Sequence, residues 1–256
     1  MKRPSDDHWN LLTPAQTKNT RLILETLNER KVRYVLGGGW AVYAHESTTP
    51  SVDCDVYLKG NLPKPLPQVL SDRGIRVGPQ LDLEILGLDT PSELLGTGEP
   101  DLGIPATSFV PAKIFKGRLG KKEIRFDKVV ADVPVPIRAA LAVAKLGALQ
   151  GRSLAYRSFV DAEARMRLGP AAAPQILSLS QSYYLRKAGK DLFDLSLLLT
   201  SVENVQEARQ IAGPDVWSVA RADLAILPPA VIELAIDMAN RVGKTTPESL
   251  LHNLRA

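Results

Sequence analysis

The sequence predicts an α+β half followed by an all-helical half, with the division near Pro136. Before that proline, short runs alternate apolar and polar residues, a pattern typical of strands. After it, apolar residues recur at helical spacing, with helix-ending residues between the segments. Hydrophobic residues make up 45% and charged residues 23% of the 256 residues, as in an ordinary globular protein. We therefore expect two domains, residues 1–136 and residues 137–256.

The first half should open with a helix over residues 16–29, because apolar side chains recur there after a Thr13-Pro14 start. A β-rich run over residues 32–36 ends at three glycines, and helix-compatible residues resume at Trp40. Residues 87–112 favour loops and short strands. The remaining expected elements are a short helix around Val69 and strands at 52–58, 81–86, 123–130 and 133–135. The strand at 133–135 should lie at a sheet edge, because Pro134 and Pro136 lack the backbone N–H that a central strand needs.

The second half is expected to consist of helices over residues 139–149, 156–167, 172–184, 191–200, 205–212 and 229–242. The unbroken apolar stretch of residues 139–144 is far shorter than the ~18–20 residues of a membrane span. The N-terminus has no apolar segment typical of a signal peptide. The single cysteine, Cys54, excludes an internal disulfide and a cysteine-based zinc site, and its place in the alternation predicts a core position. These features predict a cytoplasmic protein with no membrane partner.

The net charge of +4 is modest, but the charges are unevenly distributed. Residues 81–110 contain six acidic and no basic residues, whereas residues 113–190 contain 16 basic and five acidic residues. The basic segment suits a polyanionic partner such as nucleic acid or a triphosphate. The acidic segment could supply the acceptor pocket of an enzyme that modifies a small molecule.

The residues from Gly37 to Val56 contain the candidate metal-binding and phosphate-binding groups. A predicted strand ends in glycines, a short helix follows, and Asp53 and Asp55 then lie on the next strand. A period of two places both carboxylates on one face, about 7 Å apart. Their repulsion makes the pair costly unless a divalent cation joins them, and hard oxygen ligands suit Mg²⁺ or Mn²⁺. Gly38 and Gly39 allow backbone N–H groups to approach a phosphate at the helix N-terminus.

These motifs resemble a known family. Gly38-Gly39-x-Ala41…Ser51-x-Asp53-x-Asp55 is similar to the signature of the DNA polymerase β-like nucleotidyltransferases. More narrowly, it resembles the AbiEii-type nucleotidyltransferases, the toxins of type IV toxin–antitoxin pairs. Two downstream segments match the helical pattern of that family in the same order, Lys145-Leu146-x-Ala148-Leu149-x-x-Arg152 and Lys190-Asp191-x-x-Asp194-Leu195.

The resemblance implies a small mixed sheet in the first domain and a helical second domain that completes the active site. It implies transfer of a nucleoside monophosphate from an NTP to an acceptor hydroxyl, with release of pyrophosphate. The implied acceptor is RNA, such as a tRNA 3′ end, and a cognate antitoxin is an implied partner. Asp191 would matter for turnover, and the implied triphosphate clamp consists of Gly38, Gly39, Ser51, Lys145 and Arg152.

The pattern leaves a third carboxylate open. Asp82 is the first choice, Glu84 shares its expected strand face, and Asp127 is the runner-up. The chain also departs from the family, because Thr49 stands where relatives usually carry an arginine, which removes one expected phosphate contact. The long interval between the two downstream segments predicts an inserted helix pair around residues 156–183.

Two other functions stay open at this point. A small-molecule nucleotidyltransferase that modifies an antibiotic would use an acidic or aromatic acceptor pocket rather than a basic channel. A non-catalytic binding relative of the fold is the second alternative. The presence of both Asp53 and Asp55 argues against a non-catalytic relative, because a protein that binds no metal gains nothing from two carboxylates that repel each other.

Overall fold

The computed structural model describes residues 14–48, 51, 53–58, 62–78, 81–87, 115, 117–126, 129–166 and 174–244. The chain divides into two compact units. The first unit comprises Met1–Asp89 and Gly117–Ile137, and the second comprises Thr90–Lys116 and Arg138–Ala256. The described strands lie in the first unit and the helices after residue 137 in the second, and residues 90–116, which the predicted division places in the first half, are assigned to the second unit.

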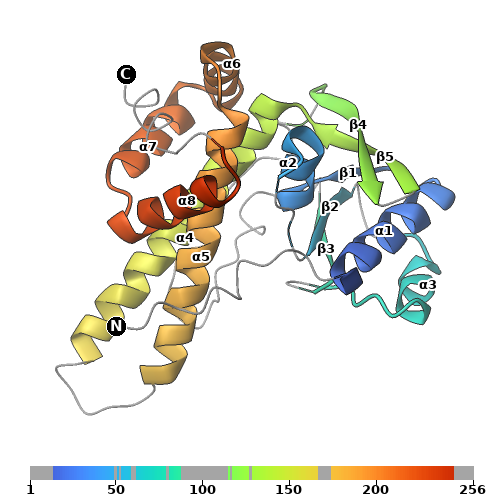
Figure 1. Ribbon diagram of the computed structural model, residues 1–256, viewed down its shortest axis with the longest axis horizontal. Helices are drawn as coiled ribbons and strands as arrows, with labels where there is room; N and C mark the ends of the chain where they lie inside the picture. Colours follow the sequence, from blue (N-terminus) through green and yellow to red (C-terminus); the bar gives the residue numbers. More distant parts are fainter. Residues whose placement is uncertain are drawn as a thin grey trace. The chain divides into compact units, whose positions relative to one another are not determined.

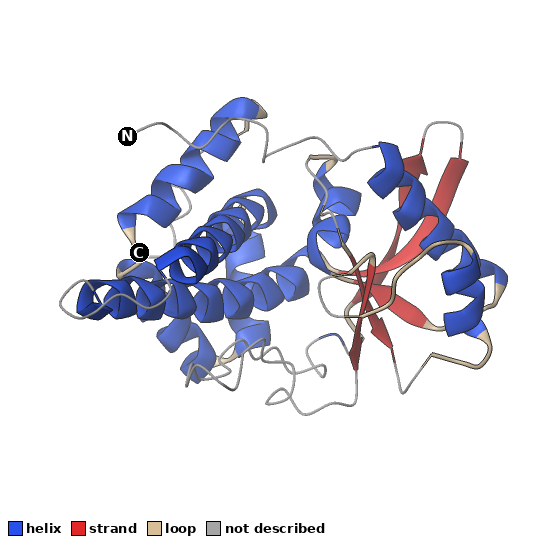
Figure 2. Cartoon of the chain, turned by 90° about the horizontal axis from the view of Figure 1, so that it is seen from below, coloured by secondary structure: helices blue, strands red, loops and turns tan. Residues whose placement is uncertain are grey.

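The first unit contains a small mixed sheet, as predicted, whose strands are drawn red in Figure 2. Its order is β1 (Tyr34–Leu36), β2 (Cys54–Leu58) and β3 (Leu83–Gly87). β1 and β2 are antiparallel, whereas β2 and β3 are parallel. Along β2, buried residues alternate with partly exposed ones, so one face of this central strand packs into the core.

Three helices accompany this sheet: α1 (Pro14–Glu29), α2 (Gly38–Glu46) and α3 (Leu66–Asp72). The helix predicted over residues 16–29 is confirmed as α1, which completely buries Ile23, Leu24 and Leu27. α2 begins at Gly38, two residues before the predicted restart, so the glycines form its first turn. Trp40 is 2% exposed, and the centre of its ring lies 5.5 Å from the ring centres of Tyr43 and Phe126.

A two-stranded antiparallel sheet completes the first unit, formed by β4 (Leu119–Phe126) and β5 (Val129–Pro136). The single strand predicted over residues 123–130 is wrong, because that stretch contains the end of β4 and the start of β5. Alternation by itself does not mark a short connection between two strands with the same pattern. The edge position predicted for the proline-containing strand is confirmed, because β4 is the one strand that pairs with β5 among the described residues.

The second unit is helical in its described part. Two long helices, α4 (Arg138–Met166) and α5 (Pro174–Leu198), run side by side (Figure 1). They are followed by α6 (Val202–Ala212), α7 (Pro214–Ala225) and α8 (Pro229–Arg241). Apolar side chains of α4 and α5, such as Leu141, Leu149 and Phe193, are almost completely buried. α5 contacts α8, and α4 contacts α6 and α7.

Two of the helix boundaries predicted for this unit are wrong. Residues 139–149 and 156–166 belong to one helix, and so do residues 174–184 and 191–198. The structure places residues 156–166 in the second part of α4 and residues 174–183 in the first part of α5, so the expected helix pair is continuous with these two long helices. A glycine inside a helix costs about 1 kcal/mol relative to alanine, and tertiary packing overrides that cost. At Gly189 in α5, an added Cβ would lie 2.8 Å from Leu234 Cδ2 of α8, so the glycine allows the two helices to approach closely.

The helix α7 is absent from the sequence prediction, although the sequence contains a signal for it. Pro214 occupies the first turn, where a proline is well tolerated, and Trp217, Ala220 and Leu224 form one buried face. Among the helices of the described residues, none is both long and apolar enough to cross a membrane. The loops and strands predicted for residues 88–112 lie outside the described residues.

Candidate functional site

Three carboxylates meet on the mixed sheet of the first unit. Oxygens of Asp53, Asp55 and Glu84 all lie within 4.8 Å of one another. The parallel pairing of β2 with β3 places Asp55 opposite Glu84, and Asp53 directly precedes β2. The predicted meeting of Asp53 and Asp55 on one face is therefore found, and Glu84 joins them. We call these three residues the acidic cluster.

The donor set of the acidic cluster fits a hard divalent cation. Carboxylate oxygens are the preferred ligands of Mg²⁺ and Mn²⁺. Three negative charges at this separation repel one another, so a bound cation would relieve an unfavourable electrostatic energy. All three side chains are partly exposed, which leaves coordination positions accessible to water or to a substrate oxygen.

The glycines preceding the cluster permit close packing of α2 against β2. Gly38 has a φ of +54°, and a Cβ built on it would lie 1.6 Å from Asp55 Oδ2. A Cβ on Gly39 would lie 2.7 Å from Ser51 Cβ. The backbone N–H of Gly37 donates to the carbonyl of Asp55 at 2.8 Å. The carboxylate of Asp55 thus lies against the first turn of α2, where the helix dipole favours negative charge.

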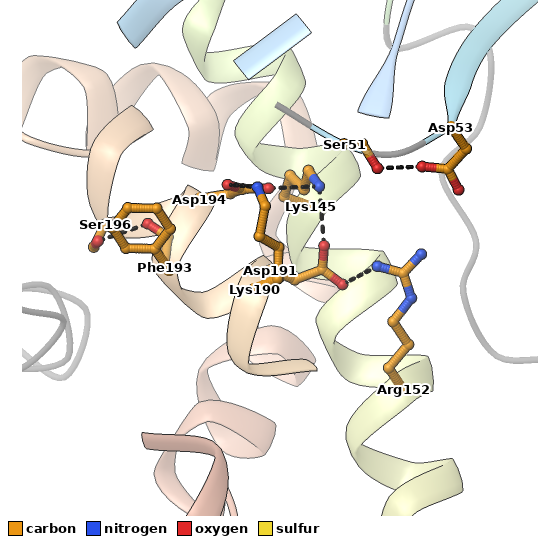
Figure 3. A network of polar contacts seen from close by, with 9 residues as sticks. All are labelled: Ser51, Asp53, Lys145, Arg152, Lys190, Asp191, Phe193, Asp194 and Ser196. Carbon is orange, nitrogen blue, oxygen red and sulfur yellow. Dashed lines mark hydrogen bonds and ion pairs between the residues drawn. The ribbon is translucent and has the colours of Figure 1, made fainter. Parts of the chain in front are cut away.

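Ser51 and Cys54 complete the immediate surroundings of the acidic cluster. The Ser51 hydroxyl donates a hydrogen bond to Asp53 Oδ1, as Figure 3 shows. Cys54 is completely buried, which confirms its predicted core position. Burial raises the pKa of the Cys54 thiol, and the charges of Asp55 and Asp53 raise it further. The thiol is therefore inert while this unit is folded.

Asp82, the first choice for the third carboxylate, is not part of the acidic cluster. Its oxygens accept hydrogen bonds from Arg76 Nε at 2.9 Å, from the Arg76 backbone N–H at 3.0 Å and from Asn19 Nδ2 at 3.3 Å. The hydrogen bond from the Arg76 guanidinium holds the pKa of the Asp82 carboxyl below its usual value, against the opposing effect of partial burial. The structure thus groups Glu84, and not Asp82, with Asp53 and Asp55. Asp127 lies outside the described residues.

Gly38→Ala is expected to disrupt the acidic cluster. The new Cβ would overlap Asp55, and a left-handed backbone costs an ordinary residue about 1–3 kcal/mol. We expect a larger loss of unfolding free energy than that strain alone and a clear loss of Mn²⁺ affinity, measured by denaturant titration and calorimetry. Gly74→Ala is the matched control, because Gly74 has a φ of +78° but no atom within 4 Å of the new Cβ. Equal effects of the two substitutions would contradict the close packing at Gly38.

A second group of charged side chains lies between α4 and α5 in the helical unit. Lys145 Nζ lies 3.0 Å from Asp191 Oδ1 and 2.8 Å from Asp194 Oδ2 (Figure 3). Arg152 pairs with Asp191 Oδ2, and Lys190 Nζ lies 2.5 Å from Asp194 Oδ1. We call these five residues the buried charge cluster. All five residues belong to the two downstream motifs that the sequence analysis singled out.

Burial and pairing oppose each other in this cluster. Both aspartates are completely buried, and Lys145 is 8% exposed. Burial disfavours the charged forms, but Arg152 and Lys145 outweigh it at Asp191 and lower its pKa. Likewise, Asp191 and Asp194 outweigh burial at Lys145 and raise its pKa. At Lys190 burial dominates over the attraction of Asp194, and the pKa is lowered.

The cluster has an interior part and an accessible part. Lys145 neutralises two buried carboxylates, so its ammonium group is largely committed within the helical unit. The side chains of Arg152 and Lys190 are 26% and 18% exposed. With three cations and two anions, the cluster carries an excess positive charge at this accessible edge. A phosphate oxygen is the chemically matched ligand for such an edge.

The described residues thus define an α+β unit with three carboxylates that could hold a cation and a helical unit with a buried charge cluster. Comparison of the chain with protein-family models, with curated proteins and with solved structures finds no match. The sequence motifs and the geometry of these two sites are therefore the basis for the function proposed next.

Proposed function

We propose that this protein is a divalent-metal-dependent nucleotidyltransferase that transfers a nucleoside monophosphate from an NTP to an acceptor hydroxyl and releases pyrophosphate. The observation that carries the proposal is the convergence of Asp53, Asp55 and Glu84 beside the glycine turn of α2. Carboxylates that hold a cation next to backbone N–H groups suit a triphosphate substrate. The order of the motifs along the chain supports membership of the polymerase β-like superfamily and of its AbiEii-type branch.

Asp53, Asp55 and Glu84 would hold Mg²⁺ or Mn²⁺, which when bound neutralises triphosphate charge and acidifies a coordinated hydroxyl. The hydrogen bond from Ser51 orients the carboxylate of Asp53. The first N–H groups of α2 lack helical acceptors and can bind a phosphate oxygen. Asp82 is a poor proton acceptor because Arg76 lowers its pKa. Glu84 is therefore the third carboxylate that we propose for the reaction.

In this proposal, Arg152 and Lys190 at the accessible edge of the buried charge cluster bind phosphate oxygens in the helical unit. Lys145 positions Asp191 and Asp194 beneath them. Catalysis by such groups consists mainly of positioning and charge stabilisation.

The test is incubation of the purified chain with each α-³²P-labelled NTP, Mg²⁺ and total RNA, followed by denaturing gel electrophoresis. We expect one NTP to label RNA of tRNA size and the Asp55→Asn variant to label none. A parallel reaction with aminoglycosides in place of RNA tests the small-molecule alternative. Absence of transfer from every NTP to every acceptor would refute the proposed activity. Relief of inhibition by the product of an adjacent gene would support the toxin–antitoxin assignment.

The proposed RNA contact rests on the basic residues around β4. Of the basic residues from 113 to 128, the described ones are Arg118, Lys121, Lys122 and Arg125, and the last three are exposed. Lys121 and Arg125 share a strand face with Glu123, which lies opposite Asp132 of β5. Because this face is of mixed charge, we expect about three phosphate contacts rather than a continuous basic surface.

Three phosphate contacts predict that tRNA affinity falls by about 40-fold between 50 and 200 mM salt, because each contact contributes a slope of just under one. The double substitution Lys121→Glu with Lys122→Glu should flatten this dependence and slow RNA labelling without changing NTP affinity. Fluorescence anisotropy with labelled tRNA measures both quantities. The control is Arg209→Glu with Arg221→Glu, which makes the same charge change on exposed positions of α6 and α7. Salt-independent transfer would instead favour a small acceptor.

A further inference from the structure

A partly exposed aromatic ring and two basic side chains share one face of α5. Tyr183, Arg186 and Lys187 lie at positions i, i+3 and i+4 of this helix, which places them side by side on its surface. All three are partly exposed. We call these three residues the α5 stripe. One turn further along the same face lies Lys190 of the buried charge cluster, about 10 Å from Tyr183 along the helix axis.

Neighbouring rings hold the Tyr183 ring in place. Its centre lies 5.2 Å from that of Tyr184, and the two ring planes meet at 83°. Tyr184 in turn stacks on Phe159 of α4, with ring centres 5.4 Å apart and an interplanar angle of 19°. Gln181 Nε2 donates a hydrogen bond to the backbone carbonyl of Phe159 at 3.1 Å, which ties α5 to α4 beside these rings. A ring that is already ordered loses little conformational freedom when a ligand packs on it.

The accessible charge around this ring is positive. Residues 174–190 of α5 include three basic and no acidic residues. Lys187 Nζ lies 5.8 Å from the centre of the Tyr183 ring, within the range of a cation–π contact. The two acids of α5, Asp191 and Asp194, are completely buried. Among the described side chains of α5, the accessible charged groups are therefore all basic.

This combination matches a nucleotide strand with unpaired bases. Proteins bind single strands by stacking bases on aromatic rings and by pairing the backbone phosphates with basic side chains. In a duplex the base faces are occupied by neighbouring base pairs, so a duplex cannot use the ring in this way. A phosphate compound without a base would use the cations alone, and an uncharged apolar ligand would use the ring alone.

We propose that the α5 stripe binds single-stranded RNA, with one base stacked on Tyr183 and the adjacent phosphates paired with Arg186 and Lys187. The strand would then extend toward Lys190, which the proposed function assigns to phosphate binding. The choice of RNA rests on the proposed nucleotidyl transfer, whereas the preference for an unpaired strand rests on the α5 stripe alone. The stripe is distinct from the basic residues of β4, which contact phosphates only.

The test measures binding of a fluorescein-labelled RNA of about ten nucleotides to the full chain by fluorescence anisotropy, without NTP or metal. The same strand annealed to its complement is the second probe. Tyr183→Leu should weaken binding of the single strand by about fivefold or more and leave binding of the duplex unchanged. Tyr183→Phe is the matched control, because it keeps the ring, and its affinity for the single strand should stay within about twofold of that of the unaltered chain.

Three outcomes of this experiment would overturn the proposal. The first is equal single-strand affinity of Tyr183→Leu and the unaltered chain. The second is an equal loss in Tyr183→Leu and Tyr183→Phe, which would assign the effect to the hydroxyl rather than to the ring. The third is an equal loss for strand and duplex. Unchanged thermal unfolding of both variants shows that the helical unit is intact.

A charge variant tests the phosphate contacts of the α5 stripe. Lys187→Gln should reduce the slope of single-strand affinity against salt concentration by just under about one unit. Lys244→Gln is the matched control, because it removes the same charge from an exposed position of the helical unit. Equal slopes for Lys187→Gln and the unaltered chain would contradict the assigned phosphate contact.

A calorimetric titration with NTP separates this inference from the proposed function. Tyr183→Leu should leave NTP affinity unchanged. Loss of NTP affinity with unchanged RNA affinity would place the base of the NTP on Tyr183 and overturn the proposal. Because RNA binding is measured without NTP, a ring-dependent preference for the single strand would support the stripe even if no nucleotide is transferred. Transfer to RNA that Tyr183→Leu does not slow would support the proposed function and overturn this inference.

Discussion

Asp55→Asn is expected to reduce nucleotidyl transfer by about a thousandfold or more, because a coordinated cation supplies several kcal/mol of transition-state stabilisation. The same variant should lose most of its Mn²⁺ affinity in isothermal titration calorimetry. Its unfolding free energy should not fall, since one of three mutually repelling charges in the acidic cluster is removed. Asp53→Asn should behave in the same way. Transfer rates and calorimetry, measured on the same preparations, check these outcomes.

Two further variants distinguish Glu84 of β3 from Asp82, which directly precedes this strand, as the third carboxylate of the site. Glu84→Gln should lose Mn²⁺ affinity, whereas Asp82→Asn should retain it, because Asp82 is held by Arg76 and Asn19 outside the cluster. Asp72→Asn, at an exposed position of α3, is a control for a general effect of removing an acid from this unit. Turnover by Asp55→Asn in Mg²⁺ comparable to that of the unaltered chain would refute the nucleotidyltransferase proposal.

Lys145→Ala is expected to destabilise the helical unit by about 3–5 kcal/mol, because it leaves two buried carboxylates without their shared cation. Thermal or denaturant unfolding followed by circular dichroism measures this change. The control is Lys187→Ala on α5, which removes a lysine whose ammonium lies 5.8 Å from the centre of the Tyr183 ring. That contact is worth only about 0.5–1 kcal/mol. A loss of similar size in both variants would show that Lys145 contributes little to the cluster.

The pKa values of the cluster also predict how stability depends on pH. The pKa of Asp191 is lowered from 3.8, so its stabilising contribution is present above about pH 4 and is lost as the pH falls through the lowered value. The pKa of Lys145 is raised from 10.5, so its contribution is present below that pH and is lost as the pH rises through the raised value. Lys145→Ala should therefore flatten the alkaline decline in unfolding free energy, which denaturant titrations across this range would detect.

Two variants test whether the buried charge cluster contributes to NTP binding. Lys145→Ala should also weaken NTP binding, because it removes one positive charge of the cluster and the partner that positions Asp191 and Asp194 beneath Arg152 and Lys190. Arg152→Gln tests the accessible edge directly, because Arg152 is the more exposed cation beside Asp191. Calorimetric titration of NTP into both folded variants measures these changes. Unchanged NTP affinity in both would assign the cluster to structure alone.

The local sequence determines much of the secondary structure and one half of the acidic cluster. Alternation along residues 52–58 correctly places Cys54 in the core and Asp53 beside Asp55, because side-chain direction in a strand depends only on the local backbone. From the glycine run the sequence predicts that backbone N–H groups approach a phosphate, whereas the close approach found in the structure is that of Asp55 to Gly38. The motif Lys145…Arg152 and Lys190-Asp191 names the members of the buried charge cluster before their contacts are known.

Tertiary structure alone decided which third carboxylate joins the cluster and how the helices are divided. Asp82 and Glu84 are equivalent by period, but the parallel register sets Glu84 beside Asp55, while Arg76 binds Asp82. The local pattern also predicts a break between residues 184 and 191, whereas α5 is continuous there and packs closely against Leu234 of α8 at Gly189. Both outcomes depend on groups distant along the chain. The free energy of packing and ion pairing between such groups exceeds the local preferences that a sequence pattern records.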